Sequence, residues 1–350
     1  MTSGLWFPAR LVLHALACTS LAACATSETA ERQDQQGKID IEDPPARPSA
    51  KALLIAMPEA RDFADARRGL VSEIKKDFNV TTFIVRPTTG VDELAAAIER
   101  TSPVGMVLMN NATLALFQKY QSRPGSNPAP PAVVLMTSFL EETASRVRNV
   151  TGIAYEVPGV TGLIHLRMVV TAPIKRVGVV FRPAFARFVD RQKLLAAREN
   201  IEILPMAVPA DVSADELREA LRALGERDKV DALWMLNDNG LIRNGAFISE
   251  TWRAVLRDVS IPLLVGVPNL VDPAESFGTL AVVPDHEALG LQAANLIFDL
   301  SENHWNVGDH AIELPLSVKT VVDIKQVRDR FGLRADALEH VDRALGQSPR

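Results

Sequence analysis

Polar and charged side chains stand directly after several apolar, strand-length runs of this sequence. In the open sheets of α/β proteins ligands bind beyond the carboxyl ends of the strands, so residues at these ends are candidates for a binding site. The candidates are Glu59, Asn110, Asn111, Thr137, Ser138, Tyr155, Arg182, Asn237, Asp238 and Asn269, with Pro58, Glu156 and Pro268 at equivalent positions. Loops commonly begin with polar residues, so helix caps and surface ion pairs are the alternative roles for this set.

Several of these side chains suit a small polar ligand. Tyr155 offers a ring that can stack on a planar group, although a tyrosine of the core is an equally good interpretation. Arg182 can hold a carboxylate through two hydrogen bonds, and Asp238 can accept hydrogen bonds from an ammonium group. Thr137 and Ser138, together with the amides of a helix N-terminus, can hold an anion. The set therefore predicts a zwitterion such as an amino acid, whereas a salt bridge or a helix cap is the alternative for Arg182 and Asp238.

The motifs of several enzyme classes are absent from the sequence. The turn after the first apolar run has no glycine before Gly69, which excludes the G-x-G-x-x-G fingerprint of dinucleotide-binding proteins. No P-loop, G-x-S-x-G or H-E-x-x-H motif occurs either. His304, Asp309 and His310 are close enough in sequence for a metal site, but ordinary loop charge explains them more simply. We therefore predict no enzymatic activity, no cofactor and no metal.

The elements that must position the candidate residues follow from the hydrophobic pattern. Apolar runs of strand length alternate with segments whose apolar residues recur at helical spacing. The expected strands are 52–57, 80–85, 104–109, 132–136, 150–155, 176–181, 203–208, 232–236, 263–267, 280–283, 312–316 and 318–324. Nearly continuous apolar strands indicate parallel sheets that helices cover on both faces. The sequence thus predicts an α/β fold with two doubly wound parallel-sheet lobes.

The 350 residues are enough for two domains, and the stretch 149–183 is their expected boundary. We expect lobe 1 to comprise residues 51–157 and 285–305, and lobe 2 to comprise 158–284 and 310–335, with 336–350 as a tail. The chain should cross between the lobes within 149–183 and again near 268–285 and 304–312. Pro158, Ser213 with Glu216 as a capping box, and Asp285 are expected to begin helices.

The N-terminal segment has the pattern of an export signal. Arg10 precedes an apolar run, Leu11–Ala23, that is too short to span a bilayer. Leu21-Ala22-Ala23-Cys24 resembles a bacterial lipobox, so we expect residues 1–24 to be a signal peptide and Cys24 to become lipidated; an ordinary signal peptide is the alternative. Residues 25–50 are polar and proline-containing, which predicts a flexible linker, with an ordered arm around 39–41 as the alternative.

The composition of the chain limits the kinds of covalent link and binding partner that we expect. Both cysteines precede residue 25, which excludes disulfides and thiolate sites from the rest of the chain. The formal net charge of −5, without a basic patch, argues against nucleic acid as a partner. Together with the expected export signal, the absence of cysteine from the rest of the chain predicts a protein outside the cytoplasm that is held to a membrane by its N-terminal lipid.

Six short motifs are spread along the chain: Asn149–Ile153, Pro173–Val180, Val230–Leu233, Ile261–Pro262, Asp285–Gly290 and Ile312–Pro315. They resemble motifs of the type I periplasmic binding proteins, the substrate-binding proteins of ABC transporters, and of their aromatic amino acid branch in particular. The similarity extends from about Lys51 to Leu333. The resemblance implies a protein that captures a small polar, amino acid-like ligand between two lobes and delivers it to an ABC permease.

Three turns on the ligand side depart from that family's usual pattern. They are Met57–Glu59, Asn110–Thr113 and Thr137–Phe139. Because these turns lie on the ligand side, the departures favour a different ligand, or the loss of ligand binding. The alternative function is therefore an outer-membrane lipoprotein of the same fold that regulates an envelope complex. An aspartate after the lipidated cysteine is associated with retention in the inner membrane, and here Ala25 follows Cys24. If the host has two membranes, we therefore expect the protein to be anchored to the periplasmic face of the outer membrane.

Overall fold

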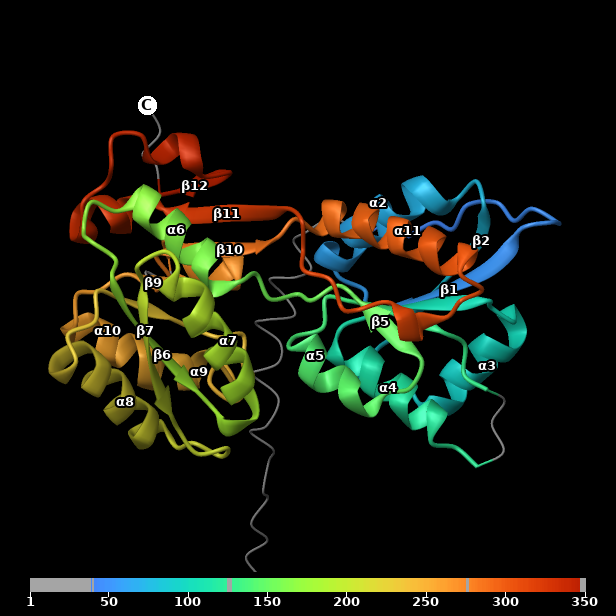
Figure 1. The fold of residues 1–350 in the computed structure, drawn as a ribbon, viewed down its shortest axis with the longest axis horizontal. Helices are drawn as coiled ribbons and strands as arrows, with labels where there is room; N and C mark the ends of the chain where they lie inside the picture. Colours follow the sequence, from blue (N-terminus) through green and yellow to red (C-terminus); the bar gives the residue numbers. More distant parts are fainter. Residues whose placement is uncertain (1–38, 40, 125–127, 275–276, 347–350) are drawn as a thin grey trace, which may run out of the picture. The chain divides into compact units, whose positions relative to one another are not determined.

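The computed structural model describes residues 39, 41–124, 128–274 and 277–346, and these form two α/β lobes (Figure 1). The sheet of lobe 1 has five strands in the order β2-β1-β3-β4-β5. The sheet of lobe 2 has seven, in the order β12-β11-β10-β9-β8-β6-β7. The predicted fold class is confirmed.

The elements of lobe 1 come from two parts of the chain. They are β1 (Lys51–Met57), α2 (Arg61–Ile74), β2 (Phe78–Ile84), α3 (Val91–Thr101), β3 (Gly105–Met109), α4 (Asn111–Gln121), β4 (Ala132–Leu135), α5 (Leu140–Thr143), η1 (Ala144–Arg146), β5 (Val150–Gly152), α11 (His286–Glu302) and η6 (Val307–Asp309).

The elements of lobe 2 also come from two parts. They are α6 (Gly159–Val169), β6 (Arg176–Phe181), η2 (Pro183–Phe185), α7 (Ala186–Ala197), β7 (Glu202–Ala207), α8 (Ala214–Arg222), η3 (Ala223–Arg227), β8 (Ala232–Trp234), α9 (Gly245–Ile248), η4 (Ser249–Arg253), α10 (Ala254–Asp258), β9 (Leu263–Val265), η5 (Pro268–Val271), β10 (Leu280–Pro284), β11 (Val318–Asp323), α12 (Ile324–Gln326), η7 (Val327–Phe331), η8 (Ala337–His340) and β12 (Arg343–Leu345).

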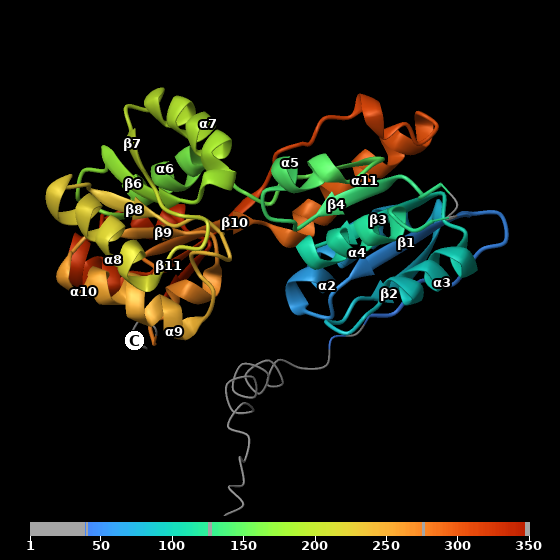
Figure 2. The ribbon, with the colours of Figure 1, turned by 90° about the horizontal axis from the view of Figure 1, so that it is seen from below.

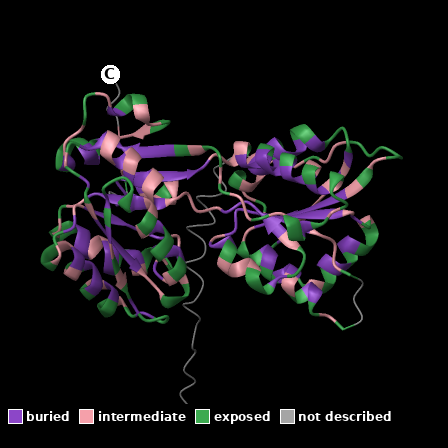
Figure 3. Ribbon diagram, viewed as in Figure 1, coloured by how far each residue is buried: buried purple, intermediate pink, exposed green. Residues whose placement is uncertain are grey.

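The inner strands bury both of their faces, as the continuous apolar runs predict, whereas edge strands such as β7 are partly exposed. Successive side chains of a strand point to opposite faces of the sheet. Leu53 and Ile55 of β1 therefore pack with α2 and α11, whereas Leu54 and Ala56 pack with α3 and α4. In lobe 2, α6 and α7 cover one face and α8 to α10 the other (Figure 2). The strands of both sheets are consequently mostly buried (Figure 3).

Lobe 2 differs from the prediction at its far edge. β11 runs antiparallel to β10, with Pro284 opposite Val318, whereas the other strand pairs are parallel. β12 then pairs with β11, so part of the segment 336–350, expected to be a tail, belongs to this sheet. A three-residue strand lacks the length that periodicity needs to be recognised in sequence.

The chain passes between the lobes three times within the described residues. The first crossing leads from β5 to α6, which begins after Pro158 as predicted. The second joins β10 to α11, where the Asp285 carboxylate accepts hydrogen bonds from the amides of Glu287 and Ala288 and caps the helix. The third lies near Ser317, whose carbonyl accepts a hydrogen bond from Asp285 N at 3.0 Å. The second and third crossings therefore run side by side.

The third crossing is later than expected. Glu313 forms a bridge with Ile153 beside β5, and Ile312 packs in the core of lobe 1. Residues 310–316 therefore lie on lobe 1 and not on lobe 2, because their backbone hydrogen bonds are made with the end of β5.

Part of the expected linker makes specific contacts with lobe 1. Asp43 accepts hydrogen bonds from Thr82 N at 2.9 Å and from Arg67 Nη2 at 2.7 Å, and Ile41 packs against the core. From Ile41 onward, residues within the range expected to be a flexible linker therefore pack on lobe 1. The expected signal peptide and Cys24 lie outside the described residues. No helix within the described ranges is both long enough and apolar enough to cross a membrane.

Two glycines allow α11 and α2 to lie in direct backbone contact. A Cβ on Gly290 would come within 1.9 Å of the Ala66 carbonyl oxygen, and a Cβ on Gly69 within 2.1 Å of the Glu287 carbonyl oxygen. These separations are far below van der Waals contact, so any larger residue forces the helices apart. The packing of α11 on lobe 1 therefore depends on the two glycines.

We predict that Gly290→Ala lowers the free energy of unfolding by about 2–3 kcal/mol, because overpacking a tight contact costs this much. Chemical denaturation checks the change. Gly245→Ala is the matched control, since a Cβ on Gly245 meets nothing within 4 Å and alanine favours a helix. Equal stability of the two variants would contradict this account of the helix pair.

Candidate functional site

Four of the predicted site residues lie at the carboxyl edge of β3 and β4, where they bond to their own surroundings. Asn110 caps α4 by accepting a hydrogen bond from Thr113 N at 2.9 Å. The Asn111 amide bonds to both backbone groups of Ser138, at 2.9 and 3.1 Å. Thr137 is fully buried and donates to the Leu135 carbonyl at 3.4 Å. These side chains stabilise the loops and do not line the cavity described below.

Two further predicted residues are exposed. Glu59 forms an ion pair with Arg86 at 3.5 Å, and Asn269 lies on η5. Neither lines the cavity.

Arg182 and Asp238 bind each other. Nε and Nη2 of Arg182 donate to the two carboxylate oxygens of Asp238 at 2.7 and 2.5 Å, and the Asp238 carboxylate also accepts from Gly240 N. Hydrogen bonding to Asp238 raises the pKa of the Arg182 guanidinium. The predicted clamp, with one residue on each end of a zwitterion, is therefore replaced by the alternative salt bridge.

Tyr155 lies at the crossings between the lobes. Its hydroxyl is 3.0 Å from Nε2 of His286, and the two rings stack with centroids 5.9 Å apart. Nδ1 of His286 is 3.6 Å from Asp62 on α2. Burial, with smaller contributions from the charges of Asp62 and Glu156, raises the pKa of the Tyr155 phenol. The phenol therefore stays neutral and acts as a hydrogen-bonding group.

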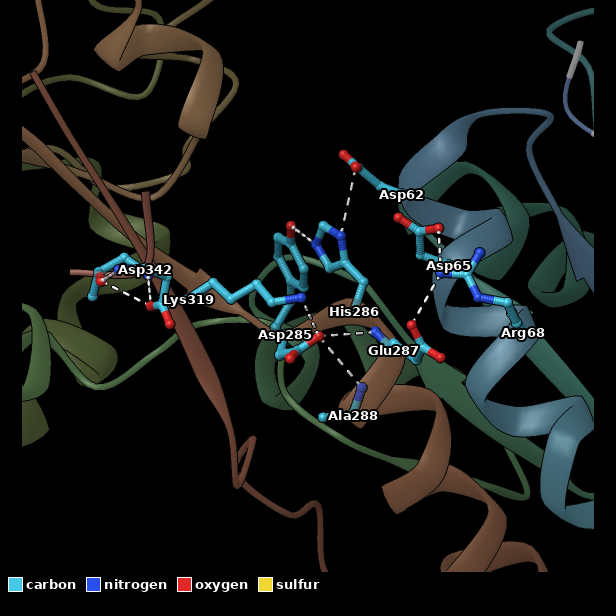
Figure 4. Close-up of polar contacts among 11 residues, drawn as sticks. Asp62, Asp65, Arg68, Asp285, His286, Glu287, Ala288, Lys319 and Asp342 are labelled. Carbon is cyan, nitrogen blue, oxygen red and sulfur yellow. Dashed lines mark hydrogen bonds and ion pairs between the residues drawn. The ribbon is translucent and has the colours of Figure 1, made fainter. Parts of the chain in front are cut away.

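The neighbouring crossing carries an ion pair (Figure 4). Lys319 of β11 reaches Asp285, with Nζ 2.9 Å from the carboxylate. Burial acts to raise the pKa of Asp285, but Lys319 and the amides of α11 outweigh it and hold that pKa below its usual value. The charge at the start of α11 is thus held by a residue of lobe 2.

One cavity lies where the first crossing meets both lobes. It is lined by Phe139, Tyr155, Glu156, Val157, Pro158, Gly159, Gly162, Phe188, Trp234, Met235, Leu236, Asn237, Leu264, Val265, Gly266, Val282 and Pro284. Its volume is about 30 Å³, enough for a water molecule or two but far below the several hundred of a typical ligand pocket. A ligand larger than water therefore enters only if part of the wall moves.

Glu156 is the only charged residue of this lining, which consists entirely of described residues. Its Oε2 accepts a hydrogen bond from Phe139 N at 2.8 Å, whereas its Oε1 is shielded from solvent and has no partner. Burial raises the pKa of Glu156 to about 7, against the lowering effect of the amides of Phe139 and of Glu156 itself and with a further increase from Glu142 and Glu141. The cavity thus holds a carboxyl group with one unused acceptor.

Aromatic rings form the wall beside Glu156. The Phe139 ring stacks on Phe185 with centroids 4.0 Å apart and meets Phe188 edge-on at 5.2 Å, and Phe188 is 6.0 Å from Trp234. Phe139 belongs to lobe 1, yet it packs in a core cluster of lobe 2. Beside it, Arg191 of α7 pairs with Glu141 and Glu142 of α5. Phe139 is therefore a residue of the cavity wall that also forms a contact between the two lobes.

Of the ten predicted site residues, the structure places only Tyr155 and Asn237 on the cavity. Glu156 also follows an expected strand but is not among the ten. Phe139, Phe188 and Trp234 were missed because an aromatic residue in an apolar run carries no signal that distinguishes a cavity wall from a core. In the sequence, the only sign that Glu156 could belong to a binding site is its position two residues before Pro158, the proline that begins α6.

Comparisons with known proteins support the fold. No family model matches the sequence, and no curated protein matches it. Solved structures do match. A ligand-free, open substrate binding protein with adhesive properties from Clostridium difficile is 14% identical, with a TM-score of 0.60, over 85% of this chain and 100% of that one.

Two others give similar values. An ABC domain in complex with L-Trp from Streptococcus pneumonia has a TM-score of 0.52 at 15% identity, over 84% of this chain and all of that one. A conserved domain protein from Vibrio cholerae has a TM-score of 0.53 at 17% identity, over 85% of this chain and 99% of that one. The chain therefore has a type I periplasmic binding protein-like fold.

We predict that Glu156→Gln changes how stability depends on pH. A carboxyl with a pKa of about 7 in the folded state and 4.5 ordinarily binds its proton more tightly when folded, so wild-type stability falls as pH rises from about 4.5 to 7. The loss is roughly 3.5 kcal/mol at most, at about 1.4 kcal/mol per pH unit. The glutamine variant lacks this fall.

Urea denaturation at pH 5 and pH 8 measures the difference, with Glu59→Gln as a control at an exposed carboxylate. Parallel pH profiles for wild type and Glu156→Gln would show that burial does not perturb this carboxyl.

Proposed function

We propose that this chain is a solute-binding protein that takes a small organic ligand into the cavity around Glu156. The observation that carries the proposal is the unpartnered Oε1 of Glu156, because a buried polar atom without a hydrogen bond costs free energy that a ligand donor recovers. Its neighbours supply what a binding site needs: apolar and aromatic walls with a few polar groups, Tyr155 and Asn237 among them.

The fold supports the same proposal. The lining residues come from both lobes and from the first crossing between them, so a ligand that contacts them affects the hinge directly. The solved substrate binding protein from Clostridium difficile shares this fold. The predicted amino acid is not retained as the preferred ligand, because it relied on Arg182 and Asp238, which bind each other.

The apolar run Leu11–Ala23 and the lipobox-like residues Leu21–Cys24 support the rest of the proposal. We propose that the mature protein is anchored by lipid at Cys24 on the periplasmic face of a bacterial membrane, and that it delivers its ligand to an ABC permease. Metabolic labelling with a fatty acid tests the anchor, because Cys24→Ala then loses the label. Co-purification with a permease tests delivery; an envelope complex in its place would support the accessory role.

We predict that Asn237→Ala weakens solute binding about five- to tenfold, since a lost hydrogen bond contributes about 1 kcal/mol. Thermal stabilisation by a panel of metabolites identifies a ligand, and isothermal titration calorimetry then measures its affinity. Asn269→Ala is the matched control, because Asn269 is exposed and lies outside the cavity. Failure of the whole panel to bind would contradict the proposed function.

A further inference from the structure

We infer that the ligand of this cavity is a small primary amine with an apolar or aromatic body, and that its ammonium group donates to Oε1 of Glu156. This inference rests on the proposed function and names the chemical class of its solute.

The residues that line the cavity indicate that its ligand is positively charged. Glu156 is its only charged residue, and no lysine, arginine or histidine contributes to it. Arg182, the residue expected to hold a carboxylate, has Nε and Nη2 on Asp238 and Nη1 on the Ala210 carbonyl. A cation therefore finds a partner in the cavity, whereas the carboxylate of an amino acid finds no basic side chain there.

The one competing feature is the N-terminus of α6, which favours anions. Its first amide, Gly159 N, already donates to Oε1 of Gln192 at 2.9 Å, and that bond is buried. The carboxyl of Glu156 precedes this terminus by a few residues and supplies negative charge there already. An additional anion would meet like charge from Glu156, so the helix terminus does not reverse the preference.

The carboxylate of Glu156 has one oxygen that still lacks a hydrogen-bond donor. Its Oε2 is already bonded to Phe139 N, and Oε1 is shielded from solvent without a partner. An N–H donor satisfies this oxygen, and a charge-assisted bond to a carboxylate is stronger than a neutral one. A quaternary ammonium has no N–H group and leaves the oxygen unsatisfied, so the primary amine is the better match.

The rest of the ligand is defined by the walls. Phe188 and Trp234 offer ring faces and edges that favour both an apolar body and a nearby cation. Because the cavity holds only about 30 Å³, the body of the ligand takes the place of the Phe139 ring. Binding therefore separates Phe139 from Phe185 and Phe188, which is a contact between the two lobes.

Four probes of similar size test the inference by calorimetry at pH 8: phenethylamine, 2-phenylethanol, phenylacetate and L-phenylalanine. We expect phenethylamine to bind at least tenfold more tightly than each of the others. Glu156→Gln should lose at least tenfold of the phenethylamine affinity and change 2-phenylethanol binding less than twofold. Glu59→Gln, a carboxylate outside the cavity, should bind phenethylamine as wild type does.

The pH profile gives a second readout. The ligand requires Glu156 as a carboxylate, and burial sets its pKa at about 7. Wild-type affinity for phenethylamine should therefore rise up to tenfold per pH unit below this value and level off above it. The other titratable or charged groups nearby are Glu141, Glu142, Arg191, Tyr155, His286 and Asp62. Comparison with Glu156→Gln, which retains all of them, isolates the contribution of Glu156.

The outcomes separate the inference from the proposed function. Tighter binding of phenylacetate, L-phenylalanine or 2-phenylethanol than of phenethylamine would overturn the amine while leaving a solute-binding protein. Equal binding of phenethylamine to wild type and to Glu156→Gln would also overturn it. Failure of these probes together with the entire metabolite panel would overturn both.

Discussion

The contact between α2 and α11 determines the path of the chain. The backbones of these helices touch at Gly69 and Gly290, where neither position can accept a Cβ. Because α11 follows β10 of lobe 2 but packs on lobe 1, the chain has to cross to lobe 1 before the helix and return after it. Both of these crossings meet the first one, and the cavity lies beside them.

Charge at the crossings is almost entirely compensated. Asp285 is held by Lys319 and by the amides of α11, Arg182 binds Asp238, and Arg191 binds Glu141 and Glu142. Glu156 is the exception, because one of its oxygens has no partner and burial raises its pKa to about 7. A protein keeps such a group at a free-energy cost, and sites of function are where that cost is commonly found.

The fold could be predicted from the sequence because its signals are local and repeated. Continuous apolar strands indicated parallel sheets, and Pro158, Ser213 and Asp285 marked helix starts that the structure confirms. The site could be predicted only in part. The rule of strand ends led to Tyr155, Asn237 and Glu156, but it could not show that Arg182 binds Asp238, since two charges 56 residues apart give no sign in sequence of their pairing. Nor could it show that Phe139 leaves lobe 1 to pack in lobe 2, because that contact depends on the crossing geometry.

The most direct test of the central claim is the structure of the protein with phenethylamine bound. The account predicts the amine nitrogen about 3 Å from Oε1 of Glu156, within hydrogen-bond distance, with the phenyl ring against Phe188 and Trp234 and with Phe139 displaced. A ligand bound elsewhere, with Oε1 of Glu156 still unpartnered and Phe139 still stacked on Phe185, would contradict it.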